Sequence, residues 1–262
     1  MAGSLLIGRI PVRYDDLSLL QRLIEQHPGI TFKALKETLT PHWTYYLSSS
    51  ASLLKETLSF GTTLGLFASS AERSWDDRTF STPYQSKHLR ATILHLLSAQ
   101  SDTSQRAFRG VHDELIDQGH IHTDISSILE CMETGPYGQV FRWNDTKVNF
   151  WSQFMHDLGL VIRLPPERVV LSPATSLLQE LLPAQGGPVR PLLETWHRDY
   201  HAVFTRLGEV HEGLARALLR LEQQGHMTFT YASDAVGSVL LCGRRISHWT
   251  HPAAGDTHVD SL

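Results

Sequence analysis

The sequence predicts a mainly α-helical fold with small β-hairpins, organised as two to three similar units joined by helices. Apolar residues recur every three or four positions along most of the chain, as at Leu17, Leu20 and Ile24, which is the spacing of amphipathic helices. Several of these stretches are followed by a glycine and then by two short apolar runs with a polar turn between them. This is the pattern of a β-hairpin. The 262 residues are 41% hydrophobic and 19% charged, as in an ordinary globular protein.

The first unit is expected to cover residues 1–86. Its three helices and two strands are predicted, in chain order, at residues 15–27, 30–39, 42–58, 64–69 and 79–82. Pro28 ends the first helix, and Thr31 is suited to cap the second, because its hydroxyl can accept a hydrogen bond from a free backbone N–H. The third helix is expected to end at about Leu58, before Phe60-Gly61.

The second unit is expected to cover residues 87–174, with a connecting helix over 85–100. Its three helices and two strands are predicted at residues 102–118, 123–133, 144–158, 161–163 and 169–171. Asp102 or Thr103 is suited to begin the first of these helices, and Gly119 to end it.

The third unit is expected to cover residues 175–250, followed by a polar tail over 251–262 that lacks apolar periodicity. Its helices are predicted at residues 174–182, 189–207 and 209–225, and a strand, a polar turn and a second strand at 226–243. The first two units share a Leu-Gly-Leu run, at 64–66 and 158–160, that leads from a helix into the hairpin, and Gly225 takes the place of this glycine in the third unit. This similarity indicates a repeated module.

The order helix, glycine, strand, polar turn and strand resembles the winged helix-turn-helix superfamily. The resemblance covers most of the chain as two winged-helix units and a weaker third. It implies that the helix before each hairpin enters the major groove of double-stranded DNA and that the hairpin, called the wing, touches phosphates. The residues that the resemblance implies for DNA contact in the first unit are Thr44, Ser48, Lys55, Arg73 and Arg78. Those of the second unit are Arg142, Lys147, Asn149, Gln153, Arg163 and Arg168.

Another group of cationic residues lies nearer the C-terminus, on the last predicted helix and after the strand that follows it. The four arginines of this group are Arg216, Arg220, Arg244 and Arg245. The first two are four residues apart and therefore neighbours on a helix. Guanidinium groups on one face can bind phosphates, but pairing with Glu212 and Glu222 can equally neutralise them.

The charge of the chain leaves two functions open. The net charge is −4, and none of the three predicted units has an excess of Lys and Arg over Asp and Glu. Asp76, Asp77 and Glu167 lie in the predicted hairpin tips, where they would repel phosphate. An acidic tandem set of this kind also resembles winged helices that act as docking modules in adaptor subunits. A protein–protein docking adaptor without DNA contact is therefore the alternative.

No enzymatic motif is recognisable in the sequence. It contains no P-loop, GxGxxG, GxSxG or paired-carboxylate nuclease pattern, and no cofactor is expected. His197 and His201 are four residues apart on a predicted helix, as two metal ligands can be, but the glutamate of the HExxH arrangement is missing. A histidine-based metal-dependent enzyme is the third alternative.

Cys131 and Cys242 lie far apart without a metal-binding spacing, so two reduced thiols in an apolar core are expected. No stretch approaches 18 apolar residues, which predicts a cytoplasmic protein without membrane contact. We expect a non-enzymatic DNA-binding protein. It is either a DNA-contacting accessory subunit of a larger bacterial complex, such as an antiviral-defence or mobile-element system, or a transcriptional regulator. Its expected partners are double-stranded DNA and either other subunits or further copies of the chain.

Overall fold

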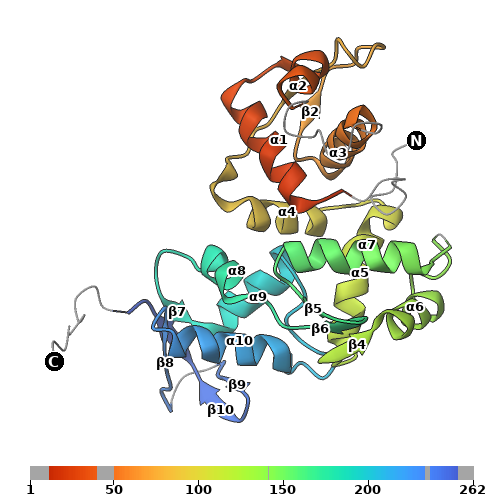
Figure 1. The fold of residues 1–262 in the computed structure, drawn as a ribbon. Coiled ribbons are helices and arrows are strands. Elements are labelled where there is room, and N and C mark those ends of the chain that lie inside the picture. Colours follow the sequence, from red (N-terminus) through yellow and green to blue (C-terminus); the bar gives the residue numbers. More distant parts are fainter. Residues whose placement is uncertain (1–11, 40–49, 141, 234–236, 253–262) are drawn as a thin grey trace, which may run out of the picture.

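The computed structural model describes residues 12–39, 50–140, 142–233 and 237–252. These residues form ten α-helices and small antiparallel sheets of two or three short strands, which confirms the predicted mainly α fold with small hairpins. In Figure 1 the first unit lies above a larger body that holds the second and third units, and α4 (Leu89–Ser98) lies between the two parts. None of the helices formed by these residues is both long and apolar enough to cross a membrane.

The described residues of the first unit, 12–39 and 50–86, form α1 (Tyr14–Gln26), β1 (Ile30–Thr31), α2 (Phe32–Leu39), α3 (Ser50–Leu64), β2 (Ala68–Ser69) and β3 (Thr79–Ser81). The central strand is β3, which pairs antiparallel with both β1 and β2. Thr31 caps α2 as predicted, since its hydroxyl accepts a hydrogen bond from the backbone N–H of Ala34 at 3.2 Å.

The third helix of this unit ends later than predicted. α3 continues through Gly61 to Leu64, and the stop is Gly65, whose φ of 90° lies in the left-handed region that favours glycine. Gly61 is a packing position, because a Cβ atom there would lie 2.4 Å from the ring of Phe67. The start predicted at His42 lies outside the described residues.

The second unit follows the short 3-10 turn η2 (Ser86–His88) and the connecting helix α4. Its elements are α5 (Thr103–Asp117), β4 (His122–Asp124), α6 (Ile125–Thr134), α7 (Asp145–Asp157), β5 (Ile162–Leu164) and β6 (Arg168–Val170). The central strand is β6, between β4 and β5. The side chains of Asp102, Asp124 and Asn144 cap α5, α6 and α7 by accepting backbone N–H hydrogen bonds.

In the third unit, residues 175–233 and 237–250 form α8 (Thr175–Leu181), β7 (Gly187–Pro188), α9 (Val189–Asp199), α10 (Glu212–Gln223), β8 (Thr228–Thr230), β9 (Val239–Leu241), β10 (Arg244–Ile246) and β11 (His248–Thr250). The expected pairing of β8 with the next strand is wrong. β9 pairs with β10 in a separate hairpin, and β8 pairs with β11. The turn at Cys242 and Gly243 explains this, because φ values of 50° and 85° suit a tight two-residue hairpin.

The second helix of the third unit is shorter than predicted. α9 ends at Asp199 instead of continuing to Leu207. The guanidinium group of Arg109, on α5, donates to the carbonyl oxygens of His197 and Arg198 at 2.7 and 3.3 Å. These hydrogen bonds satisfy carbonyl groups that the end of a helix leaves without partners, so a contact from the second unit stabilises the end of α9.

Apart from one additional hairpin in the third unit, the described residues of all three units have the same element order and the same strand order. In each unit a helix is followed by a short strand, two helices and two strands, and the last strand is central: β1-β3-β2, β4-β6-β5 and β7-β11-β8. The third unit differs because the hairpin β9–β10 precedes its last strand. The sequence does not predict β1 or β7, since two residues are too few to show the alternation of a strand.

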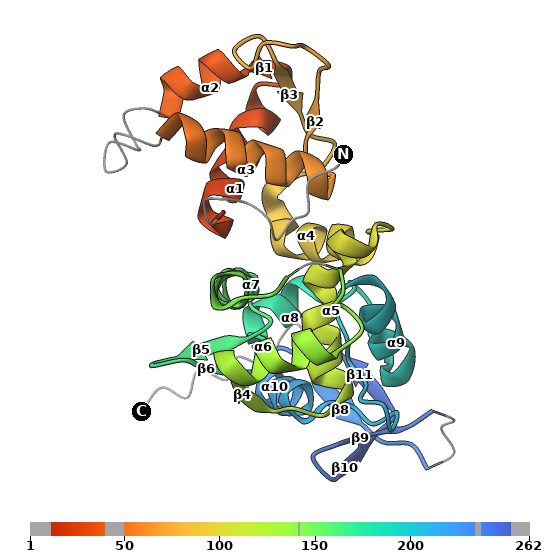
Figure 2. The ribbon, with the colours of Figure 1, turned by 90° about the vertical axis from the view of Figure 1, so that its right-hand side faces the viewer.

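Apolar side chains form one continuous core that joins the units. The ring of Phe60 on α3 packs edge-on against Phe150 and Phe154 of α7, with centroid distances of 6.4 and 5.2 Å. Trp151 of α7 is 0% exposed, and its indole N–H donates to the carbonyl oxygen of Phe108 at 3.0 Å. α3 and α7 therefore meet at the junction of the first two units, and α3 lies above α7 in both Figure 1 and Figure 2.

Candidate nucleic-acid interface

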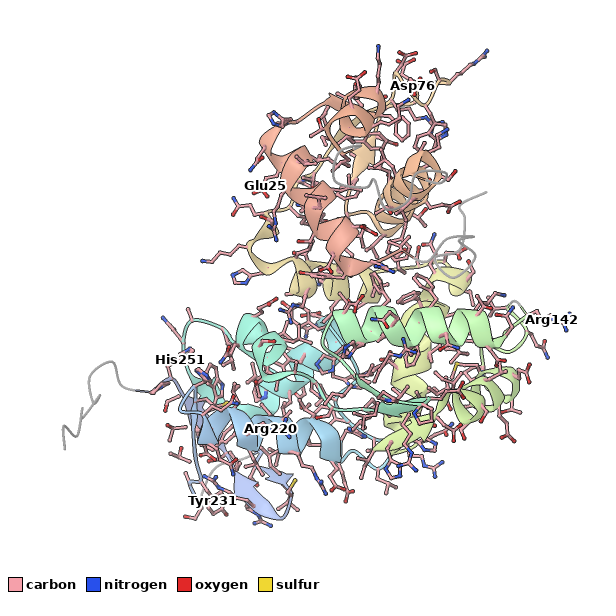
Figure 3. All side chains as sticks on the ribbon, viewed as in Figure 1. Glu25, Asp76, Arg142, Arg220, Tyr231 and His251 are labelled. Atoms are coloured by element: carbon pink, nitrogen blue, oxygen red, sulfur yellow. The ribbon has the colours of Figure 1, made fainter. Side chains whose placement is uncertain are left out.

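The residues predicted to contact DNA are spread over the molecule and do not form one surface. Figure 3 shows the hairpin loop of Arg73 and Arg78, marked by Asp76, at the top of the first unit, Arg142 at the right-hand edge of the second, and Arg220 on α10 in the third. Thr44 and Ser48 lie outside the described residues. Contact with one DNA duplex must therefore involve a subset of the predicted residues.

In the first unit, Lys55 and Arg78 both pack on Trp75. The Nζ atom of Lys55 lies 5.6 Å from the centroid of the indole ring, and the Cζ atom of Arg78 lies 4.6 Å from it. Trp75 contacts Phe32 of α2, with centroids 5.4 Å apart. These cation–π contacts hold the hairpin loop on the helices. Arg73 is exposed in the same loop.

In the second unit, Arg163 of β5 reaches back to α7. Its guanidinium group donates to the side-chain oxygens of Gln153 and Asn149, the latter at 3.2 Å. Gln153 also donates to the carboxylate of Asp157 at 2.7 Å. Three predicted DNA-contacting side chains are therefore engaged with one another, and they brace the hairpin strand against the helix.

Lys147, the predicted DNA-contacting lysine of α7, is also held by a contact within the protein. Lys147 is half-buried and donates to the carbonyl oxygen of Arg142, and burial, followed by the charge of Arg142, lowers the pKa of Lys147. Ser152 of the same helix is 0% exposed, and its hydroxyl donates to the carbonyl oxygen of Asn149 at 3.0 Å. The side chains of Arg142 and Arg168 are exposed.

The outer face of α10, the helix before the hairpins of the third unit, is open to solvent. Arg216, Arg220 and Gln223 lie on this face at intervals of four and three residues, and all three are exposed. Arg216 forms an ion pair with Glu212, and the two side chains are 63% and 43% exposed. An exposed pair at this spacing contributes only about 0.3–0.5 kcal/mol, so a phosphate group can displace the glutamate.

Arg244 and Arg245 of β10 have different surroundings. The guanidinium group of Arg244 donates to both carboxylate oxygens of Glu222 on α10 and, at 3.2 Å, to the carbonyl oxygen of Phe229. This bidentate contact fastens the hairpin to the end of α10. Arg245 is exposed, with its Cζ atom 6.0 Å from the ring centroid of Tyr231. Two of the four arginines, Arg216 and Arg244, are therefore paired with glutamate, which was the alternative to phosphate binding for this group.

The two cysteines are not the core thiols that the sequence predicts. Cys242 is exposed in the tight turn between β9 and β10, and Cys131 is half-buried on α6. Burial, followed by the charge of Glu114, raises the pKa of the Cys131 thiol, which therefore stays protonated at neutral pH.

His197 and His201 do not form a metal-binding pair on one helix, because α9 ends at Asp199. The Nδ1 atom of His197 accepts a hydrogen bond from the backbone N–H of Val203 at 3.1 Å, and His201 is buried. Within the described ranges of the chain, no three His, Cys, Asp or Glu side chains are placed to hold a metal ion.

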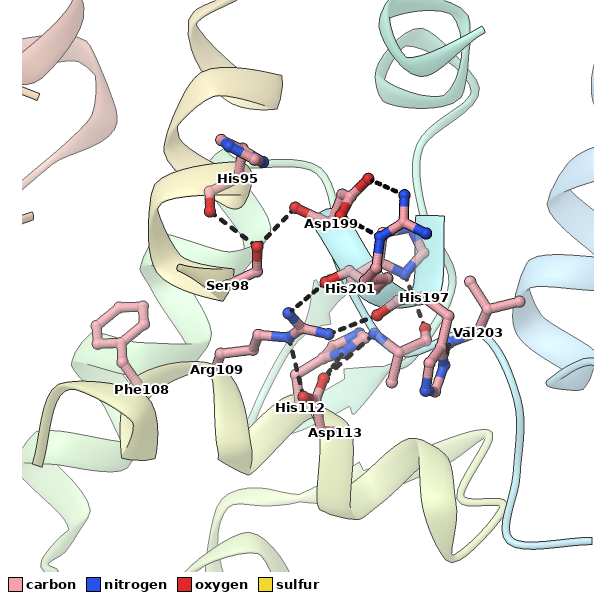
Figure 4. Close-up of polar contacts among 12 residues, drawn as sticks. His95, Ser98, Phe108, Arg109, His112, Asp113, His197, Asp199, His201 and Val203 are labelled. Atoms are coloured by element: carbon pink, nitrogen blue, oxygen red, sulfur yellow. Dashed lines mark hydrogen bonds and ion pairs between the residues drawn. The ribbon is translucent and has the colours of Figure 1, made fainter. Parts of the chain in front are cut away.

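Figure 4 shows a polar cluster between α5 and the end of α9 that the sequence does not predict. The Nε atom of Arg109 lies 2.9 Å from Asp113, whose other carboxylate oxygen accepts the backbone N–H of Ala202 at 3.2 Å. Burial raises the pKa of Asp113, but His112 and Arg109 outweigh it, so the pKa is lowered. The i, i+4 spacing of Arg109 and Asp113 is the signal that indicates an ion pair there.

The outer face of α10 and the adjoining hairpin are the best candidate for a nucleic-acid interface in the part of the chain that the structure describes. Arg216, Arg220 and Arg245 are exposed cations of this surface, and Arg244, whose side chain is 49% exposed, is held by Glu222. Comparison with family models, with curated protein sequences and with solved structures found no match for this chain.

Proposed function

We propose that this chain is a non-enzymatic protein of three winged-helix units that contacts double-stranded DNA through the third unit, as an accessory subunit of a larger complex or as a transcriptional regulator. The observation that carries the proposal is the exposure of α10 with Arg216 and Arg220. The equivalent helices α3 and α7 pack on one another through Phe60. The repeated element and strand order supports the winged-helix relationship.

The number of exposed arginines limits the strength of DNA binding. Arg216, Arg220 and Arg245 can neutralise three phosphates, for which the logarithm of the binding constant should fall with the logarithm of salt concentration with a slope of about −2.7. Glu212, which is paired with Arg216, reduces the attraction further, and Glu222 holds the fourth arginine, Arg244. This surface therefore suits weak, sequence-tolerant contact, to which other subunits add affinity.

The proposal predicts that replacing both arginines of α10 by alanine weakens DNA binding at low salt by tenfold or more. The double variant Arg216→Ala/Arg220→Ala loses two phosphate contacts, so the salt slope should shrink by about 1.8. Fluorescence anisotropy with a labelled duplex of random sequence, between about 50 and 200 mM salt, measures both quantities.

The matched control is the double variant Arg73→Ala/Arg168→Ala, which removes two exposed arginines from the hairpins of the first and second units. It should bind the duplex as the native protein does. Absence of binding by the native protein at low salt, or an equal loss in the control, would rule out α10 as the DNA-contacting helix.

A protein-docking adaptor is the second candidate, because large apolar side chains are exposed on the third unit. Leu207 is 78% exposed, Leu240 is 56% exposed and Tyr231 is 47% exposed. Leu240 also lines a pocket of about 500 Å³ together with Phe204 and Val239. Leu207 lines another pocket, of about 260 Å³. Scattered apolar residues are ordinary on a protein surface, but exposed leucines that line pockets favour a docking site.

Under the docking function, Leu207→Asp/Leu240→Asp should abolish co-purification with the products of the neighbouring genes when these are co-expressed with the chain. An inserted carboxylate would have to be desolvated in an apolar interface. Leu164→Asp is the matched control, since Leu164 is 45% exposed but lies on the second unit. Unchanged co-purification of the double variant contradicts docking at this surface.

A further inference from the structure

Two buried histidines of the third unit lie at its junction with the second unit. His201 follows α9 and His211 precedes α10, and their side chains are 2% and 1% exposed. The ring of His201 is edge-on to that of His112 on α5, with centroids 5.9 Å apart, in the cluster drawn in Figure 4. The closed junction keeps the His201 ring from water, whereas His211 lines a pocket of about 260 Å³ between the two units.

Hydrogen bonds define the neutral form of both rings. The Nδ1 atom of His201 lies 2.8 Å from the carbonyl oxygen of Ala202, so Nδ1 carries the proton and Nε2 does not. This Nε2 atom is buried and has no hydrogen-bond partner among the described residues. His211 donates from Nε2 to the carbonyl oxygen of His120 at 2.8 Å and accepts at Nδ1 from the N–H of Gly213 at 3.2 Å.

A second proton cannot be accommodated on either ring while the junction is closed. On His201 it would create a buried charged N–H group with no acceptor. On His211 it would point at the N–H of Gly213 and remove the hydrogen bond that caps α10.

The surrounding charges do not compensate for this cost. The titratable and charged groups around the two rings are Arg109, His112 and Asp113 of α5, His120 before β4, His197 of α9 and Glu212 of α10. Burial, followed by the neighbouring His112, lowers the pKa of His201 to about 3, although Asp113 acts in the opposite direction. Burial also lowers the pKa of His211.

We propose that protonation of His201 and His211 in mildly acidic solution opens the junction between the second and third units, so that pH controls how α10 is held against the rest of the protein. An opened chain takes up the proton at the ordinary histidine pKa of 6.5, whereas the closed junction takes it up on His201 only at about 3. The closed junction therefore has its full stability above pH 6.5 and loses it progressively as the pH falls toward 3. This inference does not depend on DNA contact by α10.

The expected effect can be measured by amide hydrogen exchange. Between about pH 8 and pH 5, one histidine with a pKa of 6.5 in the open state increases the opening equilibrium constant about 30-fold. Residues 199–213 should show at least this loss of protection once exchange is corrected for the pH dependence of the intrinsic rate. The helix α1 of the first unit serves as the internal reference and should show no such change.

The variant His201→Gln keeps a neutral hydrogen-bonding side chain. Its opening equilibrium constant should increase between pH 8 and pH 5 by a factor about 30-fold smaller than that of the native protein. His226→Gln replaces an exposed histidine of the same unit and should leave the effect unchanged. The proposal is overturned if native residues 199–213 lose no more protection than α1 between the two pH values. This test uses the native protein alone, so it remains valid even if a variant does not fold. Retention of the full effect in folded His201→Gln also overturns it.

Discussion

Replacing Gly213 with alanine is expected to destabilise the protein by about 3 kcal/mol, the upper end of the usual cost of overpacking. Gly213 lies in the first turn of α10, where this helix meets the second unit. A Cβ atom there would lie 1.8 Å from the carbonyl oxygen of Leu171 and 2.9 Å from its carbonyl carbon. The N–H of Leu171 donates to the carbonyl oxygen of Ile121 at 2.9 Å, which holds this backbone in place. The alanine variant must therefore move α10 away from the second unit.

Chemical denaturation of the Gly213→Ala variant measures this loss as a change in the free energy of unfolding. Gly187→Ala is the control, because a Cβ atom at Gly187 would meet nothing within 4 Å. Its free energy of unfolding should change by less than about 0.5 kcal/mol. Equal stability of the two variants would contradict the close contact between α10 and Leu171.

Replacing Phe60 with alanine is expected to lower the free energy of unfolding by about 3–5 kcal/mol. Phe60 is 6% exposed, and its ring packs edge-on against Phe108, Phe150 and Phe154, with centroid distances of 6.2, 6.4 and 5.2 Å. Truncation leaves a cavity at the junction of the first two units. We therefore also expect the first unit to unfold at a lower urea concentration than the other two, which gives a broader transition.

Urea denaturation followed by circular dichroism tests both expectations for Phe60→Ala. Leu240→Ala is the control, because Leu240 is 56% exposed on the hairpin of the third unit, and its truncation should cost less than about 0.5 kcal/mol. A loss below about 1 kcal/mol in Phe60→Ala would mean that α3 is not held against α7 by this aromatic cluster.

Local sequence decides where several of the helices begin and end. Thr31 caps α2, and Asp102, one of two caps considered for α5, accepts the first backbone N–H groups of that helix. Gly65 and Gly159, the glycines of the two Leu-Gly-Leu runs, have φ values of 90° and 82° and follow α3 and α7. A cap or a stop involves residues within one turn of one another, which is why these features and the mainly α fold are visible in the sequence.

Local sequence also identifies the cationic residues of α10. It does not show which side chains of the protein the other predicted DNA-contacting residues contact. Lys55 and Arg78 pack on the ring of Trp75. Arg163 is bonded to Asn149. These partners lie on different elements, and no spacing pattern predicts that they meet.

Only the tertiary structure decided the length of α9, the strand pairing of the third unit and which of the predicted cationic side chains stay exposed. α9 ends where Arg109 of α5 binds its last carbonyl groups. β8 pairs with β11 because the turn after β9 returns the chain as a separate hairpin. Contact between Phe60 and Phe150 joins α3 to α7, whereas Arg216 stays exposed on α10. Periodicity reports neighbours along the chain, and these outcomes depend on contacts between residues far apart in it.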